Sequence, residues 1–440
     1  MKTAFFQRIT SFLILIVACS GFAWAQESQP SGTATVDQEK EDQDAKQKAK
    51  KEADEAKRKD RLGMFSEVRN NATLSFGISE VYDSDVFGTI NDRQGGSYTL
   101  LYPRFFANLE KPTVQLTFDY AGGYRFFNKF TQLNSAMHNG GIEFRYQPST
   151  RSVFSVADRM SYFPLDIQVA GGQALLPGTG SGVPPAVVLF NNKPVFRNMF
   201  EGSWTYLLSG QTSIRLSGTY SPIRYPDLPT QDSDGYTAGF ELNHRLTPKF
   251  AFSTEYNLLY SRFNNTFSSL STHRTGIGFT YDVRPSFSVF ASGGPEMTTN
   301  LGLSRVDFYV RGGVRRSARS VTFTTQYERS VQNYSGLAAP LSSQSVGFDI
   351  SRAFAGRFVV GAGGLYFWSH AFAATADTLN GLQVGPRLIY KVRPNMSFTM
   401  NYSYIKQTGS SLALALGPPS LSRHLINFGF EYRLPPLLRR

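Results

Sequence analysis

The sequence predicts an all-β protein, a transmembrane antiparallel up-and-down β-barrel of about 18 strands. Three observations indicate this fold. Apolar and polar residues alternate along runs of about 11 residues, which is the pattern of a strand with two different faces. A unit of two such runs and a short turn recurs about every 36 residues. After the N-terminal segment, no stretch approaches the ~20 apolar residues of a spanning helix, although aromatic residues make up 14% of the chain.

The repeating unit is clearest in residues 276–293. Ile277, Phe279 and Tyr281 share one face of its first run, and small or polar residues occupy the other face. Proline turns end such runs at Pro248, Pro285 and Pro394. Proline presets φ for a turn and cannot donate inside a sheet. Because each repeat adds a hairpin, the pattern predicts one large closed sheet instead of two or three soluble domains.

Residues 1–25 predict a secretory signal peptide. A positive start and a short apolar run at residues 12–18 precede a small-x-small pattern that ends at Ala25. The alternative is lipidation at Cys19, which lies in a lipoprotein-like box. Cys19 is the only cysteine, so cleavage after Ala25 leaves no thiol. That outcome excludes disulfides, cysteine catalysis and zinc–thiolate sites.

Residues 26–69 predict a charged periplasmic tether. Between residues 37 and 61 nearly every side chain belongs to Asp, Glu, Lys, Arg, Gln or Ala, and no apolar face forms. Such a segment cannot bury a core, so we expect it to be solvated. The alternative is contact with the cell wall or another periplasmic partner.

The barrel is predicted over residues 70–434 and is followed by a C-terminal tail at 435–440. Short and long connections alternate along it, as in barrels whose short turns face the periplasm. The even strand count leaves both ends of the barrel on the side of the tether. The expected strands are 72–82, 98–109, 113–126, 136–146, 152–162, 197–207, 212–220, 236–245, 250–260, 274–283, 286–294, 305–315, 321–329, 345–352, 358–368, 382–391, 396–404 and 425–434.

The two faces of these strands differ in chemistry. One face is apolar and the other carries charge, which favours lipid outside and a polar lumen inside. Aromatic residues collect at both strand ends, which indicates two interfacial girdles. The alternative is the ordinary enrichment of aromatic residues in strands. The candidates for lining the lumen are Arg125, Arg145, Arg197, Arg215, Glu241, Arg245, Glu255, Asp307, Arg311, Arg315, Glu328 and Arg387.

The formal net charge of +12 does not indicate nucleic-acid binding. The surplus of basic residues gathers near the short turns, where it would meet anionic lipids of the inner leaflet. The five histidines show no metal-ligand spacing. No catalytic grouping and no cofactor or metal motif can be read from the sequence, which therefore predicts a protein that is not an enzyme.

The stretch 77–87 (GISEVYDSDVF) resembles the opening strand and loop of barrels encoded beside exopolysaccharide systems. With its proline turns, the region 70–434 resembles Gram-negative outer-membrane β-barrels of the porin type. Such barrels commonly end on an aromatic residue that the assembly machinery reads. Here Phe428, Phe430 and Tyr432 are followed by a further tail.

The resemblance implies a location in the bacterial outer membrane, with the tether and the C-terminus in the periplasm. The expected partners are outer-membrane lipid, lipopolysaccharide and the barrel-assembly machinery. The first functional hypothesis is a porin-like channel for passive passage of polar solutes. The alternatives are a conduit or accessory for exopolysaccharide export and a plugged structural or adhesive barrel.

Overall fold

The computed structural model describes residues 71–87, 93–164, 194–227, 229, 232–264, 269–300, 302–318, 320–332, 341–371, 378–409 and 420–435. The predicted signal peptide (1–25) and tether (26–69) lie outside these residues. Within the described ranges, no helix is long and apolar enough to cross a membrane.

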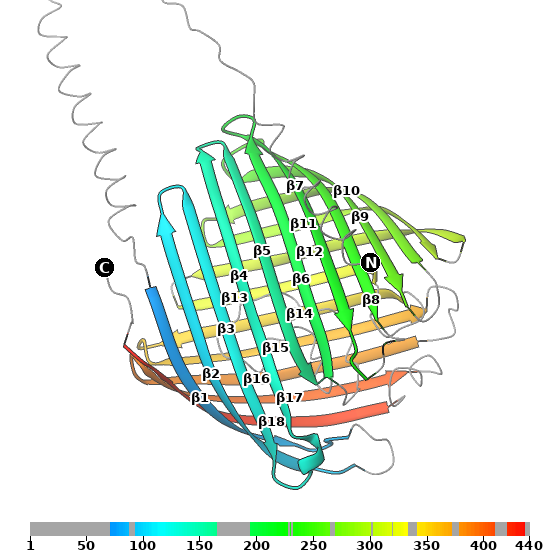
Figure 1. The fold of residues 1–440 in the computed structure, drawn as a ribbon. Coiled ribbons are helices and arrows are strands. Elements are labelled where there is room, and N and C mark those ends of the chain that lie inside the picture. The colour runs from blue at the N-terminus through cyan, green and yellow to red at the C-terminus, as the bar shows by residue number, and fades with distance from the viewer. Residues whose placement is uncertain are drawn as a thin grey trace, which may run out of the picture. The chain divides into compact units, whose positions relative to one another are not determined.

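The described chain forms 18 strands and one short 3₁₀ helix (Figure 1). The strands are β1 Asn71–Asp83, β2 Gly96–Lys111, β3 Val114–Phe127, β4 Ser135–Ser149, β5 Ser152–Pro164, β6 Pro194–Leu207, β7 Thr212–Arg224, β8 Ser233–Arg245, β9 Phe250–Phe263, β10 Ser269–Arg284, β11 Phe287–Asn300, β12 Leu303–Ala318, β13 Val321–Gln332, β14 Leu341–Phe354, β15 Phe358–Ala371, β16 Thr378–Arg393, β17 Met396–Gly409 and β18 Ser420–Arg433. The helix η1 spans Thr131–Leu133.

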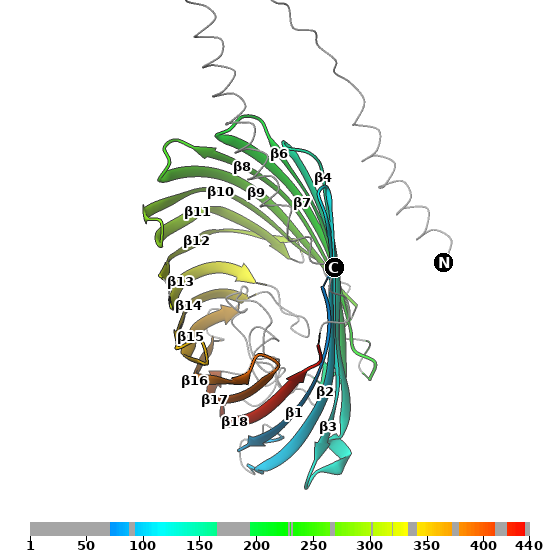
Figure 2. The ribbon, with the colours of Figure 1, turned by 90° about the vertical axis from the view of Figure 1, so that its left-hand side faces the viewer.

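The sheet is closed. Each strand pairs antiparallel with its neighbours in the chain, for example β2 with β1 and β3. The last strand pairs with the first, from Ser75 opposite Arg433 to Asp83 opposite Leu425, and Figure 2 shows β18 lying beside β1. The prediction of an antiparallel up-and-down barrel of about 18 strands is confirmed. We call the end at which β1 begins and β18 finishes the inner end, and the opposite end the outer end.

Many strands are longer than their alternation predicts. They hold 12–16 residues, whereas the sequence ranges hold mostly 8–12. Strand β12, for example, was expected at 305–315 and spans Leu303–Ala318. The added residues are mostly polar and lie near strand ends. Polar residues on both faces erase the period-two signal, so hydrophobic alternation finds only the central part of each strand.

The outward face is apolar and bordered by aromatic rings. On β1, Phe76 and Ile78 are 50% and 46% exposed, while Ser75 and Ser79 on the opposite face are buried. On β5, Phe154 near the inner end and Tyr162 near the outer end share the outward face. A sheet closed on itself has no core outside its wall, so this face needs an apolar environment.

The inner face carries apolar residues as well as the charges that the sequence predicts. A buried apolar cluster covers it at the outer ends of β1–β3. The cluster consists of Val81, Val86, Tyr98, Leu100, Tyr102, Phe127 and Phe130, with Phe87, Leu133 and Met137 packed against it. The helix η1 supplies Leu133. These side chains form a local core inside the barrel.

The outer end of the closing seam holds a buried ion pair, Asp83–Arg423, which we call the seam pair. Arg423 donates to Asp83 through Nε at 2.6 Å and also through Nη2. Both side chains are 1% exposed. The Asp83 carboxylate also accepts the backbone N–H of Asp85 at 2.9 Å. The seam pair therefore joins β18 to the end of β1.

Candidate functional site: the inner wall

The ladder registers assign every strand side chain to one face, because directly opposite residues in an antiparallel pair share a face. Starting from buried Ser75 on β1, the registers of successive pairs place all twelve candidate residues on the inward face. Whether these residues line a water-filled lumen belongs to the proposed function.

Two loose ion pairs lie on the inner wall between β4 and β7. Arg159 Nη2 lies 3.6 Å from Glu143 Oε2, with side-chain exposures of 53% and 47%. Arg215 Nη2 lies 3.7 Å from Glu201 Oε1, with exposures of 46% and 34%. Arg145, one of the candidates, lies nearer the inner end of β4. These inward charges are open to solvent, which is not the case for the seam pair.

Carboxylates gather on the next strands. Glu241 on β8 lies directly opposite Glu255 on β9. Asn243 Nδ2 donates to Glu241 Oε1 at 2.9 Å. The Tyr309 hydroxyl reaches from β12 to donate to Glu255. The Tyr309 side chain lies over Gly276 on β10. A Cβ at this position would lie 1.6 Å from the Tyr309 hydroxyl oxygen. Glycine at this position is required by the close approach of the ring.

A tighter pair lies beside this group, towards the outer end. Arg274 Nη2 donates to Glu296 Oε1 at 2.7 Å, and the Glu296 side chain is fully buried. The other oxygen of Glu296 accepts the backbone N–H of Val331 at 2.9 Å. The Arg274 guanidinium lies 4.8 Å from the centre of the Tyr309 ring. Both partners of this pair are held in place by further contacts, so the pair is a fixed part of the wall.

The candidate Asp307 connects three strands near the outer end. Its Oδ1 accepts from Arg329 Nη2 on β13 at 2.7 Å and from the N–H of Phe308 at 2.8 Å. Its Oδ2 accepts from Ser342 on β14 at 3.3 Å. The registered pairing of β12 with β13 ends at Val310. The Asp307 carboxylate therefore bridges a region where the ladder between these strands has stopped.

Closer to the inner end, β12 and β13 carry a polar chain. Arg311 Nη2 donates to Gln326 Oε1 at 3.5 Å, and Gln326 Nε2 donates to Glu328 Oε2 at 3.2 Å. The candidates Arg315 and Arg245 lie nearer the inner ends of β12 and β8. None of the candidate residues in this group is fully buried.

One bidentate pair stands on β14 and β16. Arg387 donates to the two oxygens of Asp349 at 2.7 and 2.8 Å. The side chains are 39% and 40% exposed. Glycines at 361 and 363 lie between them on β15. A Cβ at Gly361 would lie 2.8 Å from Arg387 Nε, so the glycine leaves room for the guanidinium.

Two candidates lie against aromatic rings. Arg125 is 3% exposed, and its guanidinium lies 5.5 Å from the Tyr98 ring and 5.3 Å from the Phe127 ring. Arg197 lies 5.8 Å from the Phe163 ring. Arg125 also donates to the Ser135 hydroxyl at 2.9 Å. Arg125 is thus part of the apolar cluster at the outer end.

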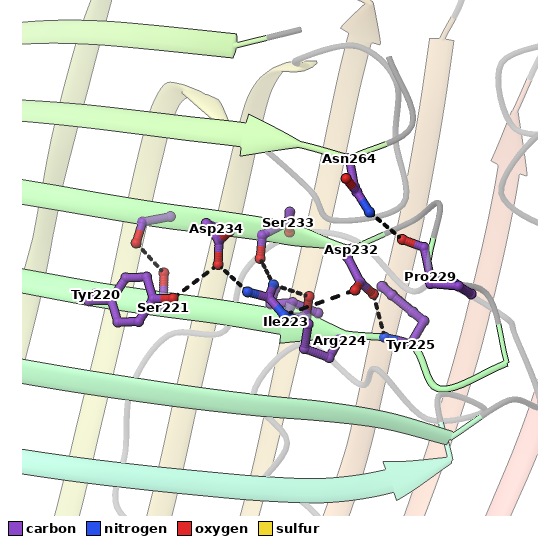
Figure 3. Close-up of polar contacts among 11 residues, drawn as sticks. Tyr220, Ser221, Ile223, Arg224, Tyr225, Pro229, Asp232, Ser233, Asp234 and Asn264 are labelled. Atoms are coloured by element: carbon purple, nitrogen blue, oxygen red, sulfur yellow. Dashed lines mark hydrogen bonds and ion pairs between the residues drawn. The ribbon is translucent and has the colours of Figure 1, made fainter. Parts of the chain in front are cut away.

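The outer ends of β7 and β8 are held by a network around Arg224 (Figure 3). Arg224 Nη2 donates to Asp234 Oδ1 at 2.5 Å, and that oxygen also accepts from the Tyr220 hydroxyl at 3.1 Å. Asp232 accepts the backbone N–H of Tyr225 at 2.8 Å. Beyond the strands, the backbone N–H of Asn264 donates to the Asp232 carbonyl at 3.0 Å. The network ties the β7–β8 connection to the end of β9.

Several contributors to the inner wall are absent from the twelve sequence-derived candidates, among them Arg159, Glu296, Tyr309 and the seam pair. Period-two counting from Val156 would have placed Arg159 inward. No local signal shows that Tyr309 reaches β9 or that Arg423 meets Asp83, because the partners are far apart in sequence. Among the described residues, no group of three or more His, Cys, Asp and Glu side chains could hold a metal ion.

Comparison with known proteins finds similar folds among solved structures. Pseudomonas aeruginosa OpdQ matches with 11% identity and a TM-score of 0.44, over 84% of this chain and 98% of that one. Pseudomonas aeruginosa OprD matches with 9% identity and a TM-score of 0.42, over 84% and 98%. The siderophore receptor PirA from Pseudomonas aeruginosa matches with 8% identity and a TM-score of 0.41, over 83% and 81%.

These values assign no function to the chain. No protein-family model matches the sequence, and no curated protein matches it.

Proposed function

We propose that the barrel spans the bacterial outer membrane and forms a water-filled channel for passive passage of small polar solutes. The outward face supports the membrane location, because a closed wall of apolar residues bordered by aromatic rings satisfies its backbone internally and suits lipid. At 18 strands, a barrel is wide enough for an aqueous lumen.

The observation that carries the channel proposal is the exposure of inward ion pairs at mid-strand. Arg387 and Asp349 are 39% and 40% exposed although they point to the inside of a closed sheet. Glu143 and Glu201, on the other side of the barrel, are 47% and 34% exposed. Charges in a dry interior would have to be fully paired and hydrogen-bonded. Their half-exposed state favours water inside the barrel.

The proposed orientation places the inner end in the periplasm. Both chain ends of the barrel lie there, and hairpin turns such as those at Pro285 and Pro394 connect strands at the same end. Basic side chains near these turns would meet the inner leaflet. In this orientation lipopolysaccharide surrounds the outer end, the assembly machinery inserts the barrel, and residues 26–69 are available to a periplasmic partner.

The proposal involves no catalysis. Passage through such a channel needs only a polar path with solvated charges along it, and the inner wall supplies charges of both signs. A mixed wall predicts weak selectivity between small cations and anions, because neither sign dominates the path.

The test is conductance across a planar bilayer with the purified, refolded chain. Steady conductance steps in salt, with permeability to both ions, are the expected result. A barrel that migrates as folded on an unheated gel yet gives no steps would refute an open channel and favour a plugged structural barrel. Block by an added acidic oligosaccharide, with no block by a neutral one of equal size, would instead favour polysaccharide export.

A further inference from the structure

Asp158 occupies an unusual place on the outward surface. It lies in the middle of β5, six residues from each strand end. Its register partners are Ile142 and Phe200, which are 45% and 46% exposed on the outward face. Four residues on either side stand the aromatic residues Phe154 and Tyr162. At about 3.3 Å per residue, the carboxylate lies roughly 13 Å along the strand from each girdle.

No other outward charge of the described strands lies so deep. Every other outward Asp, Glu, Lys or Arg lies within three residues of a strand end, where water or headgroups can reach it. These are Glu80, Lys111, Arg224, Asp234, Arg262, Arg284, Arg316, Arg352, Arg393 and Lys406, whereas the guanidinium of Arg329, also near a strand end, reaches Asp307. A charged side chain at the centre of a bilayer is unfavourable and is usually paired or shielded by protein.

Among the described residues, Asp158 has one hydrogen-bond partner, Asn198 on β6. Asn198 Nδ2 donates to Asp158 Oδ1 at 2.5 Å and makes a long contact of 3.5 Å with the carbonyl of Arg159. Both side chains are half-buried. Asp158 Oδ2 and Asn198 Oδ1 accept no hydrogen bond from the rest of the described chain. The pair therefore presents two acceptors without a donor, Asp158 Oδ2 and Asn198 Oδ1, to the outward surface, together with the Asn198 amide nitrogen.

The outward surface beside this pair is recessed, because small residues lie between rows of larger ones. Register places Val156, Gly202, Gly218 and Ala238 directly opposite one another across β5–β8. A Cβ at Gly202 would meet nothing within 4 Å, and at Gly218 only the Thr237 carbonyl at 3.7 Å. Aromatic and aliphatic side chains stand in the rows on both sides: Phe200, Tyr220 and Tyr236 on one side, and Trp204, Leu216 and Phe240 on the other. The row forms a shallow groove within the membrane-facing wall.

We propose that this surface, Asp158, Asn198 and the groove through Gly202 and Gly218, is the interface with a second copy of this chain. Lipid tails offer no hydrogen-bond donor at this depth, so a protein surface must satisfy the free acceptors. A two-fold axis beside Asp158 makes the surface self-complementary, because the second amide hydrogen of each Asn198, which makes only the long contact with the Arg159 carbonyl, can then be donated to Asp158 of the partner subunit. Small residues in the groove let the two walls approach closely.

The proposal rests on the barrel spanning a membrane and is independent of what the lumen conducts. The interface uses only outward side chains of β5–β8, whereas the channel uses inward ones. The two ideas can therefore fail separately. A dimer that gives no conductance steps would contradict the channel alone, and a conducting monomer would contradict the interface alone.

The test measures the mass of the full chain in nanodiscs or mild detergent by light scattering and native mass spectrometry. We expect a dimer. Asp158→Leu combined with Asn198→Leu should weaken association about 10-fold or more, because interchain hydrogen bonds of this kind contribute roughly 1 kcal/mol each and two are lost. These substitutions add apolar surface to a membrane-facing wall, so the monomer should still fold.

A second variant tests the groove without touching the polar pair. Gly202→Leu has open space within its own chain, so it should fold normally yet hold the two copies apart. The matched control is Gly312→Leu on β12, another outward mid-strand glycine, whose Cβ would have no neighbour closer than 3.5 Å. The control should remain dimeric. A monomeric wild-type protein, or a dimer that survives both the double leucine variant and Gly202→Leu, would overturn the proposal.

Discussion

The seam pair provides the sharpest test of how the barrel is closed. Asp83 and Arg423 are separated by 340 residues in sequence and are both 1% exposed. Replacing Asp83 by Asn preserves the shape of the side chain but removes its charge. It also turns one acceptor into a donor that faces the guanidinium. The variant therefore leaves the Arg423 guanidinium buried without the opposite charge of Asp83 at the junction of the first and last strands.

The expected loss of stability is large for a single polar substitution. At least one of the two hydrogen bonds to the charged guanidinium is lost, and such a bond contributes about 1.5–3 kcal/mol. Removing one partner of a buried ion pair typically costs about 3–5 kcal/mol, because the other charge remains buried. We expect Asp83→Asn to lower the free energy of unfolding by about that amount. Asp349→Asn, in a bidentate pair that is 40% exposed, should lower it by about 1 kcal/mol or less.

The assay is urea unfolding of the barrel in lipid vesicles, followed by fluorescence of Trp204 and Trp368. The double variant Asp83→Asn/Arg423→Met completes a double-mutant cycle, in which the double variant should cost well below the sum of the single ones. Equal losses for Asp83→Asn and Asp349→Asn, or additive effects in the cycle, would refute the reasoning that burial makes the seam pair critical.

Three further outcomes follow from the inner wall. Arg387→Met should leave the Asp349 carboxylate unpaired in the lumen and raise the cation-to-anion permeability ratio, measured as a shift in reversal potential under a salt gradient. Gly276→Ala should displace the Tyr309 hydroxyl and lower the free energy of unfolding by about 1–3 kcal/mol, whereas Tyr309→Phe/Gly276→Ala should recover part of that loss. Gly385→Ala should also destabilise the barrel by about 1–3 kcal/mol in urea unfolding, because its Cβ would lie 1.8 Å from the Tyr402 carbonyl oxygen and no side-chain rotation relieves that contact.

The local pattern of the sequence was sufficient to predict the barrel. In the hairpin of β10 and β11, Ile277 and Phe279 lie outward, as the alternation predicts, and are 60% and 42% exposed. The ladder shifts register between Asp282 and Arg284, next to the turn that contains Pro285. Period-two alternation and turn residues act within a few positions of each other, so one sequence reveals them directly.

Features that depend on pairing across the barrel could not be predicted in this way. Asp83 and Arg423 lie just beyond the strands expected at 72–82 and 425–434, and no local pattern shows that they meet, since closure joins the two ends of the chain. The span of Tyr309 to Glu255 depends on Gly276, which lies on a strand between them. Asp158 breaks the apolar face at mid-strand, and its meaning is visible only when the registers show how deep it lies and that Asn198 is its partner.

The inner wall is unequal around the barrel, and this bears on what a solute would meet. On β14–β18 the inward mid-strand positions include glycines at 347, 363 and 385, so Arg387 and Asp349 project from a recessed surface. Strands β6–β9, on the opposite side of the closed sheet, carry Glu201, Arg215, Glu241 and Glu255, with Arg197 and Arg245 nearer the strand ends. A polar solute in transit would pass between one isolated ion pair and a wall that carries charges of both signs. Because both sets of charges remain half-exposed, they can exchange water for solute groups at little cost, as passive passage requires.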